Sequence, residues 1–206
     1  MNNSQSQQAE MSRRTDAVEA VAIERGLIVP SHLDQFTHKV EEEWTQSTGA
    51  AIVARAWVDA AFKQRLLANG IAGITEMGAS MPKHHRHLVV LENTATLHNV
   101  ICCTLCSCTA FSIIGMPPDW YKELEYRARV VRESRTVLRE MGLNLGEQME
   151  IRVWDTTADT RYMVVPYRPA HTEGMSEQAL AAMITKEAMI GTQRLEPAAN
   201  YSPARS

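Results

Sequence analysis

Three cysteines within six residues give this sequence its clearest chemical feature. Cys103, Cys106 and Cys108 lie in the segment Cys-Thr-Leu-Cys-Ser-Cys, and one other cysteine, Cys102, precedes them. Thiolates at this spacing can converge on one metal ion. If Cys106 and Cys108 both bind, two backbone amide nitrogens, those of Ser107 and Cys108, lie between their sulfurs at chelating distance.

This arrangement predicts a catalytic metal site. Cys103 can cap the ion from one side, which leaves the opposite position open for water or substrate. The predicted ligands are Cys103, Cys106, Ser107 and Cys108.

Other kinds of cysteine site fit the sequence less well. A structural zinc site commonly takes four side-chain ligands in two separated pairs, and an iron–sulfur cluster takes four thiolates. The sequence has no second pair, and Cys102 would have to share a site with its immediate neighbour. A non-catalytic zinc site, and cysteines that bind no metal, remain the alternatives.

Length, charge and apolar content limit the classes of protein to which this chain could belong. A chain of 206 residues suits one domain plus an arm, and a net charge of -3 gives no electrostatic reason to expect nucleic acid or a membrane surface as partner. No apolar run is long enough to span a bilayer, and the polar segment Met1 to Gln8 lacks a signal peptide's hydrophobic stretch. We therefore expect a cytoplasmic protein.

Apolar periodicity and capping residues predict the helices. One runs from Arg13 to Arg25 and ends at Gly26, and a second begins at Pro30. A longer stretch covers residues 49–69, with Asp59 as a possible cap that restarts it. The remaining helices are expected at residues 119–123, 133–141 and 176–190.

Strands are expected where β-branched or alternating residues occur. These segments are residues 88–91, 150–154 and 160–166, with a polar connection at residues 93–99. Strands and helices in this mixture, without regular βαβ repeats, predict the α+β class. We expect a disordered tail at residues 1–12, a helical arm and helix at 13–70, a metal-binding core at 71–192 and a C-terminal tail at 193–206.

The cysteine segment resembles the metal-binding motif of the nitrile hydratase alpha subunit, and the likeness covers about residues 15–192. The other segments that resemble the family are Ile113–Lys122, Glu125–Arg132, Ile151–Thr157, Arg161–Met163 and Arg168–Gly174.

The resemblance implies a layered α-β-β-α core and an N-terminal helical arm that lies against a partner chain. Core packing is the alternative for Trp44 and for the apolar stripe at Phe36. The implied cofactor is one low-spin, non-corrin Fe(III) per alpha subunit, or Co(III), with no organic cofactor. Cys106 is then a sulfinic acid, Cys108 a sulfenic acid and Cys103 an axial thiolate, which agrees with the cysteine oxidation series.

The resemblance also implies a hydro-lyase that converts small nitriles to amides. It is active only with a beta subunit, whose arginines bind the oxidised sulfurs. An αβ heterodimer, doubled to α2β2, and a metallochaperone or activator protein are the implied partners. The same motif occurs in thiocyanate hydrolase, which is the alternative enzyme; a non-catalytic zinc-binding subunit is the alternative of another class.

The sequence gives conflicting indications about which metal binds. Thr104 resembles cobalt-type subunits, whereas Thr109-Ala110-Phe111 and Glu125–Arg132 resemble the iron type. We expect iron.

Two further positions are candidates for a role beside the metal. His84, in the run Lys83–His87, falls where iron-type subunits place a glutamine, and His84 or His85 could orient water or accept a proton. A solvated basic turn and a metal-capture role are the alternatives. Arg161 and Asp159 match family positions that help hold the metal loop, and a surface ion pair is the alternative for them.

Overall fold

The computed structural model describes residues 2–195, which divide into two compact units, 2–43 and 44–195. The N-terminal unit consists of α1 (Asn2–Glu24), α2 (Pro30–His38) and a π-helical turn η1 (Lys39–Glu43). Residues 2–12 are therefore helical where the sequence predicted a disordered tail. Pro30 begins α2 as expected, because proline's missing N–H costs nothing in the first helical turn.

The N-terminal unit leaves its apolar side chains largely exposed. Phe36 is 56% exposed, which does not support core packing of this residue. Other exposed apolar residues of this unit are Met11, Val18, Val21, Leu27 and Val29. That this arm lies against a partner chain stays a prediction, and the predicted C-terminal tail falls mostly outside the described residues.

The second unit begins with three helices joined by capping residues. These helices are α3 (Gln46–Val58), α4 (Ala60–Ala68) and α5 (Gly70–Glu76). Asp59 interrupts the predicted stretch and caps α4, because its carboxylate accepts a hydrogen bond from the Phe62 amide at 2.9 Å. Asn69 caps α5 in the same way, so the sequence-based prediction missed a third helix here.

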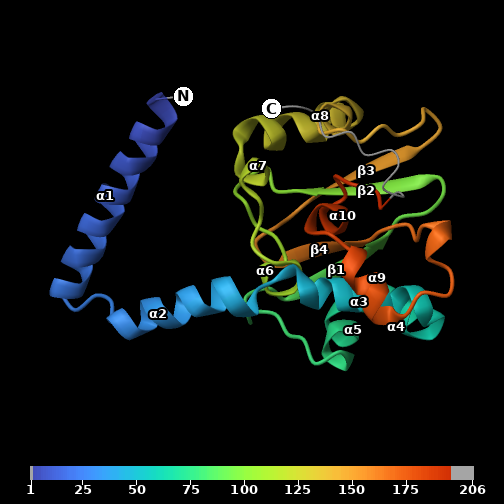
Figure 1. Cartoon of the computed structure of the whole chain (residues 1–206), viewed down its shortest axis with the longest axis horizontal. Coiled ribbons are helices and arrows are strands. Elements are labelled where there is room, and N and C mark those ends of the chain that lie inside the picture. Colours follow the sequence, from blue (N-terminus) through green and yellow to red (C-terminus); the bar gives the residue numbers. More distant parts are fainter. Residues whose placement is uncertain (1, 196–206) are drawn as a thin grey trace. The chain divides into compact units, whose positions relative to one another are not determined.

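Within residues 2–195, four strands form two parallel, two-stranded sheets (Figure 1). The pairs are β1 (His87–Glu92) with β4 (Thr160–Val165), and β2 (Leu97–Cys102) with β3 (Glu150–Asp155). The α+β class is therefore confirmed as mixed helices and small sheets, and the α-β-β-α layering stays a prediction. The expected polar connection at 93–99 was too long, because β2 already begins at Leu97.

Helices pack on both sheets. Contacts join α8 (Leu124–Glu140) to β2 and β3, and join α4 and α5 to β1. Glu133, where the sequence predicted a helix to start, is instead a non-helical residue within α8. The predicted closing helix is divided into α9 (Glu177–Met183) and α10 (Lys186–Ile190), because Thr185 caps the second one. The remaining elements are α6 (Phe111–Ile114), α7 (Asp119–Lys122) and a 3-10 turn η2 (Ala170–Thr172).

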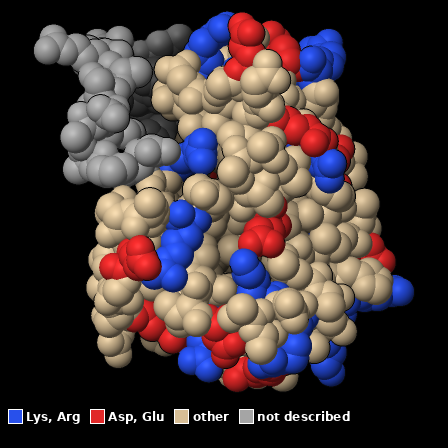
Figure 2. Space-filling model, turned by 90° about the vertical axis from the view of Figure 1, so that its right-hand side faces the viewer, with Lys and Arg blue, Asp and Glu red and all other residues tan. Residues whose placement is uncertain are grey.

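On the face shown in Figure 2, acidic and basic side chains are interspersed among uncharged ones, without an extended patch of one sign. No helix of the described residues is both long and apolar enough to cross a membrane.

A buried polar network joins the start of β2 to the end of α10. The His98 ring contacts the Gly191 carbonyl through Nε2 at 2.7 Å and the Asn93 amide through Nδ1 at 3.2 Å. Asn93 also accepts hydrogen bonds from Asn99, and Asn99 from the Trp154 indole. Because Nδ1 must accept from the Asn93 amide, the network needs neutral His98 with its proton on Nε2.

The packing of the end of α10 against β2 requires a glycine at position 191. Its φ is +95°, and a Cβ there would lie 2.0 Å from the Asn99 carbonyl oxygen. A glycine is therefore required where α10 ends against β2.

This network predicts acid-sensitive stability. Burial lowers the pKa of His98 from its ordinary value of 6.5, so below that pH the unfolded chain binds more protons than the folded one. The His98 contribution is present above pH 6.5 and is lost as the pH falls through the lowered pKa. In His98→Leu, the Gly191 carbonyl and the Asn93 amide lose their partner, and we expect the free energy of unfolding at pH 7.5 to fall by about 2–4 kcal/mol.

Denaturant unfolding at several pH values measures both effects, with His87→Leu as the control. His87 is exposed on β1, so its replacement should change the unfolding free energy by less than about 0.5 kcal/mol. Equal stability of the two variants, or an unchanged pH dependence in His98→Leu, would contradict this assignment.

Candidate metal centre

The strand register places the cysteine loop. The loop covers residues 103–110, between the last residue of β2, Cys102, and the start of α6. Cys102 is aligned with Asp155, the last residue of β3. Because the strands are parallel, the residues that follow them, Cys103 and Thr156, emerge at the same edge of the sheet.

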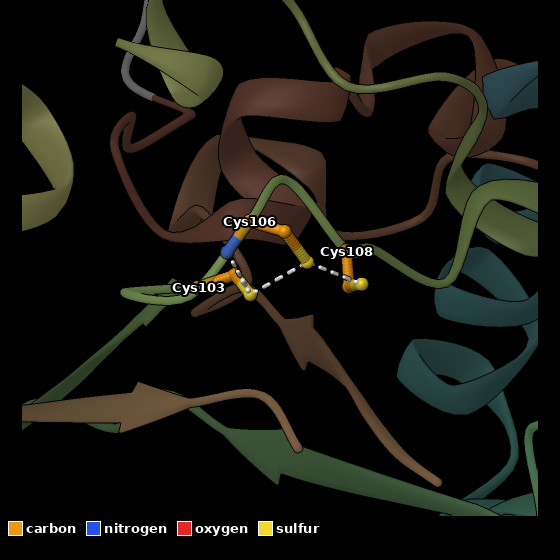
Figure 3. A group of neighbouring side chains, drawn as sticks. All are labelled: Cys103, Cys106 and Cys108. Carbon is orange, nitrogen blue, oxygen red and sulfur yellow. Dashed lines mark hydrogen bonds between the residues drawn. The ribbon is translucent and has the colours of Figure 1, made fainter. Parts of the chain in front are cut away.

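The three predicted cysteine ligands converge. Their sulfurs all lie within 4.8 Å of one another. Figure 3 shows the Cys106 sulfur between the other two. It lies 3.4 Å from the Cys103 sulfur and 2.8 Å from the Cys108 sulfur. The Cys106 amide also points inward and donates to the Cys103 sulfur at 3.3 Å. The three sulfurs therefore converge as the sequence spacing predicted, and metal binding by the Ser107 and Cys108 amides stays a prediction.

The thiols differ in environment. Cys103 is buried, Cys108 is half-buried and Cys106 is exposed. Burial alone would raise the pKa of Cys103, but hydrogen bonds from the Thr156 hydroxyl and from the loop amides outweigh it, and this pKa is lowered. Burial raises the pKa of Cys108, and the Cys106 thiol adds to the effect. Cys102 is outside the cluster, and burial raises its pKa to about 12.

Neighbouring elements hold both ends of the loop. At its start, the Thr104 amide donates to the Asp155 carboxylate at 2.9 Å, and the Thr104 hydroxyl donates to the same group. At its end, the buried Tyr121 hydroxyl donates to the Cys108 carbonyl at 3.2 Å. The cysteine positions are thus set by contacts to β3 and α7 and not by the loop alone.

Arg161 is a buried cation beside this loop. It lies on β4, only 4% exposed, and its Nη1 donates to the carbonyls of Thr157 and Thr160. Its positive charge opposes the effect of burial on Cys108. The pKa of that thiol is still raised, because burial outweighs the Arg161 charge. Arg161 Nε is buried without a hydrogen-bond partner in the described part of the chain. A buried donor normally has a partner, so this nitrogen is an unsatisfied donor in the described structure.

The histidine run is divided between core and solvent. His84 is exposed, whereas His85 is 4% exposed, with its ring 5.1 Å from that of Phe111. Burial, together with the nearby charge of Arg161, lowers the pKa of His85 to about 4, so this imidazole is neutral at pH 7. Its Nδ1 and the hydroxyl of buried Thr109 also lack hydrogen-bond partners among the described residues.

Asp159 has a different set of contacts. Its carboxylate accepts hydrogen bonds from Thr157 and Thr160 and lies 4.0 Å from His87. These contacts stabilise the turn between β3 and β4 and do not reach the cysteine loop.

Sequence reasoning did not assign roles to Asp155, Thr156, Tyr121 or Arg127, which all contact the loop. The polar pair that directly follows the strand at residues 150–154 is a signal that could have revealed Asp155 and Thr156. Tyr121 and Arg127 reach the loop through the packing of α7 and α8, which sequence spacing does not specify.

The donor set fits a metal ion. Thiolates are soft ligands suited to transition metals. The three sulfurs lie within 4.8 Å of one another, close enough for one ion to reach all of them.

Comparisons with known proteins agree with this geometry. The family profile described as "Nitrile hydratase, alpha chain" matches residues 9–193. The chain belongs to the nitrile hydratase alpha-subunit family. A relative, the low-molecular weight cobalt-containing nitrile hydratase subunit alpha of Rhodococcus rhodochrous, is 46% identical over 88% of this chain and 87% of its own length.

Two other members widen the comparison. A solved structure of the Fe-type nitrile hydratase from Comamonas testosteroni Ni1, a double mutant with two histidines replaced by alanine, has a TM-score of 0.89 and 54% identity, with 96% of each chain covered. The thiocyanate hydrolase subunit gamma of Thiobacillus thioparus is 34% identical over 92% of this chain and 82% of its own length. The family thus includes cobalt-containing and Fe-type nitrile hydratases and a thiocyanate hydrolase.

The two adjacent buried cysteines provide a test of the ligand set. In the complex of this chain with a beta subunit, Cys103→Ala should abolish stoichiometric metal binding, because one of the three converging sulfurs is removed. Cys102→Ala, which removes a buried thiol outside the cluster, should keep the metal. Elemental analysis of the purified complexes measures the outcome, and equal metal content in the two variants would refute the assignment of Cys103.

Proposed function

We propose that this chain is the alpha subunit of a nitrile hydratase, which adds water to the C≡N group of a small nitrile and releases the amide. The observation that carries the proposal is the convergence of three cysteine sulfurs in a chain of this family. The reaction combines one nitrile with one water and needs no electron donor or acceptor. The site must therefore bind and orient the nitrile and the water, and move protons between them.

The proposed metal ligands are the sulfurs of Cys103, Cys106 and Cys108 and the amide nitrogens of Ser107 and Cys108. One trivalent ion per chain, when bound, supplies a Lewis acid that polarises the nitrile and acidifies water. The exposed position of Cys106 and the half-buried position of Cys108 agree with a site that opens towards substrate.

We further propose that Cys106 is oxidised to the sulfinic acid and Cys108 to the sulfenic acid, with Cys103 left as a thiolate. Oxidised sulfurs carry anionic oxygens, and partly buried ones need cationic donors. The unpartnered Nε of Arg161, whose charge acts on Cys108, supports this assignment. The Cys108 oxygen is then a candidate nucleophile or base directed at the nitrile.

A beta subunit would complete the site. Nitrile hydratase alpha subunits partner with beta subunits, and the exposed loop residues Leu105 (85% exposed) and Cys106 support a partner surface here. The proposed assembly is an αβ heterodimer doubled to α2β2, with a layered α-β-β-α alpha subunit and an activator protein that loads the metal. The beta subunit's arginines would bind the remaining sulfur oxygens, so the alpha chain alone should be inactive.

Iron is the proposed metal, and cobalt the alternative. The similarity to the Fe-type Comamonas enzyme at 54% identity, against 46% for the cobalt-containing Rhodococcus subunit, supports iron. The iron-like segment Thr109-Ala110-Phe111 agrees, whereas Thr104 is the residue typical of cobalt subunits.

The histidine pair is proposed to act beside the metal, with His85 as its buried member. A neutral imidazole in contact with Phe111 can orient water or accept a proton. His84, exposed and stacked edge-on against His85 at 4.2 Å between ring centres, would act through His85.

Thiocyanate hydrolysis is the second candidate reaction, supported by 34% identity to the Thiobacillus subunit. The higher identity to nitrile hydratases favours nitriles. A non-catalytic zinc subunit would explain neither the single cysteine cluster nor the unpartnered Arg161 donor.

The decisive experiment uses the chain purified with its beta subunit. We expect near-stoichiometric iron, or cobalt, by elemental analysis, and conversion of aliphatic or aromatic nitriles to amides. We also expect Cys106 and Cys108 to gain two and one oxygen atoms in the mass spectrum of the loop peptide. Zinc alone with no turnover would contradict the proposal, and turnover of thiocyanate without nitriles would establish the second candidate.

The histidine proposal has its own test. His85→Ala should lower kcat by about 10-fold or more and alter the pH profile, because the buried neutral imidazole is lost. His87→Ala removes an exposed imidazole of the same run and serves as the control. If His84→Ala/His85→Ala kept the turnover, pH profile and metal content of the unchanged complex, neither histidine would have a role.

A further inference from the structure

Arg127, in the first turn of α8, makes contacts that join that helix to the cysteine loop. Its Nε donates to the Cys103 carbonyl at 3.0 Å, and its Nη2 donates to the Thr104 carbonyl at 2.9 Å. Its Nη1 donates to the Lys122 carbonyl at 3.3 Å, at the end of α7. One planar guanidinium therefore fixes two successive peptide groups of the loop and the helix beside them.

The opposite side of the same peptide groups is held by an anion. Asp155 accepts from the Thr104 amide at 2.9 Å and from the Thr104 hydroxyl. In a trans peptide unit the C=O and N–H groups point in opposite directions. Because Arg127 draws the Cys103 carbonyl to one side, the Thr104 N–H is directed to the other side, where Asp155 receives it.

This pair of contacts fixes the orientation of the chain at Cys103. The turn that follows brings the Cys106 amide to 3.3 Å from the Cys103 sulfur and the Cys106 sulfur to 3.4 Å. A rotation of the peptide between Cys103 and Thr104 would move these groups apart.

We infer that Arg127 is a positioning residue of the metal centre, which sets the Cys103 sulfur and the first turn of the loop for ligation. The inference rests on the proposed function, since it requires that the loop holds the catalytic metal. Arg127 does not touch substrate; it acts through the carbonyls of Cys103 and Thr104.

A second arginine of α8 provides a matched control. Arg135 also donates to three backbone carbonyls of a neighbouring loop, those of Leu145 and Gly146 through Nη1 and that of Met149 through Nη2. Both arginines are half-buried, and that second loop is separate from the cysteines. Arg127→Gln and Arg135→Gln therefore remove the same number of backbone hydrogen bonds from the same helix, but only the first affects the cysteine loop.

The experiment compares Arg127→Gln, Arg127→Lys and Arg135→Gln in the metal-loaded complex with the beta subunit. The readouts are metal affinity, the sulfur-to-metal charge-transfer absorption, and kcat and KM per bound metal. We expect Arg127→Gln to lower metal affinity or kcat by about 10- to 100-fold and to shift the absorption, with a smaller change in KM. Arg127→Lys should recover part of the loss, because an ammonium keeps the charge without the planar fork.

Arg135→Gln should lower the melting temperature about as much as Arg127→Gln and leave the absorption and kcat per metal unchanged. The inference is overturned if Arg127→Gln matches Arg135→Gln in metal affinity, absorption and kcat per metal, whatever its melting temperature. If Arg127→Gln does not assemble, Arg127→Lys decides: unchanged affinity, absorption and kcat would overturn the inference. Lack of nitrile turnover in the unchanged complex would contradict the proposed function alone, because metal affinity and absorption still test Arg127.

Discussion

The parallel pairing of β2 with β3 is the constraint on which the cysteine site depends. Their register aligns Cys102 with Asp155, so the residues that follow each strand emerge together. This brings the Asp155 carboxylate and the Thr156 hydroxyl to a loop that comes from a segment about fifty residues earlier in the chain. If the register of β2 against β3 shifted by one residue, every side chain of the shifted strand would face the other side of the sheet, and these groups would separate.

The short connection from β3 to β4 extends the same constraint to the second sheet. Only residues 156–159 separate the two strands, so the start of β4, with Arg161, lies close to the end of β3. Arg161 is aligned with Leu88 of β1, which places the histidine run before β1 in the same region. The loop therefore has a buried cation near Cys108 and a second cation, Arg127, at Cys103.

These cations explain how a dense group of thiols can be accommodated in a partly buried loop. Charged sulfurs are costly to bury without donors. The chain provides the loop amides and the Thr156 hydroxyl as donors to Cys103, and the Arg161 charge acts on Cys108. The exposed side of Cys106 has no such donors from the described residues near it, which agrees with a family whose alpha subunits work with a beta subunit.

The sequence by itself determined that Cys103, Cys106 and Cys108 would converge, because their spacing is local and a short loop can bring its own sulfurs together. It also determined the family, the caps at Asp59 and Ser176, and most strands, since these depend on neighbouring residues. It misjudged residues 93–99, where His98 and Asn99 are polar but buried in strand β2, because their partners on α10 and β3 are distant in sequence. Only the tertiary structure decided that His85 and not His84 is the buried histidine and that Asp159 stabilises a turn. It also decided that Arg127 and Asp155 both form hydrogen bonds with the Thr104 backbone. Each of these depends on strand register and helix packing, which bring together side chains that no spacing in the sequence relates.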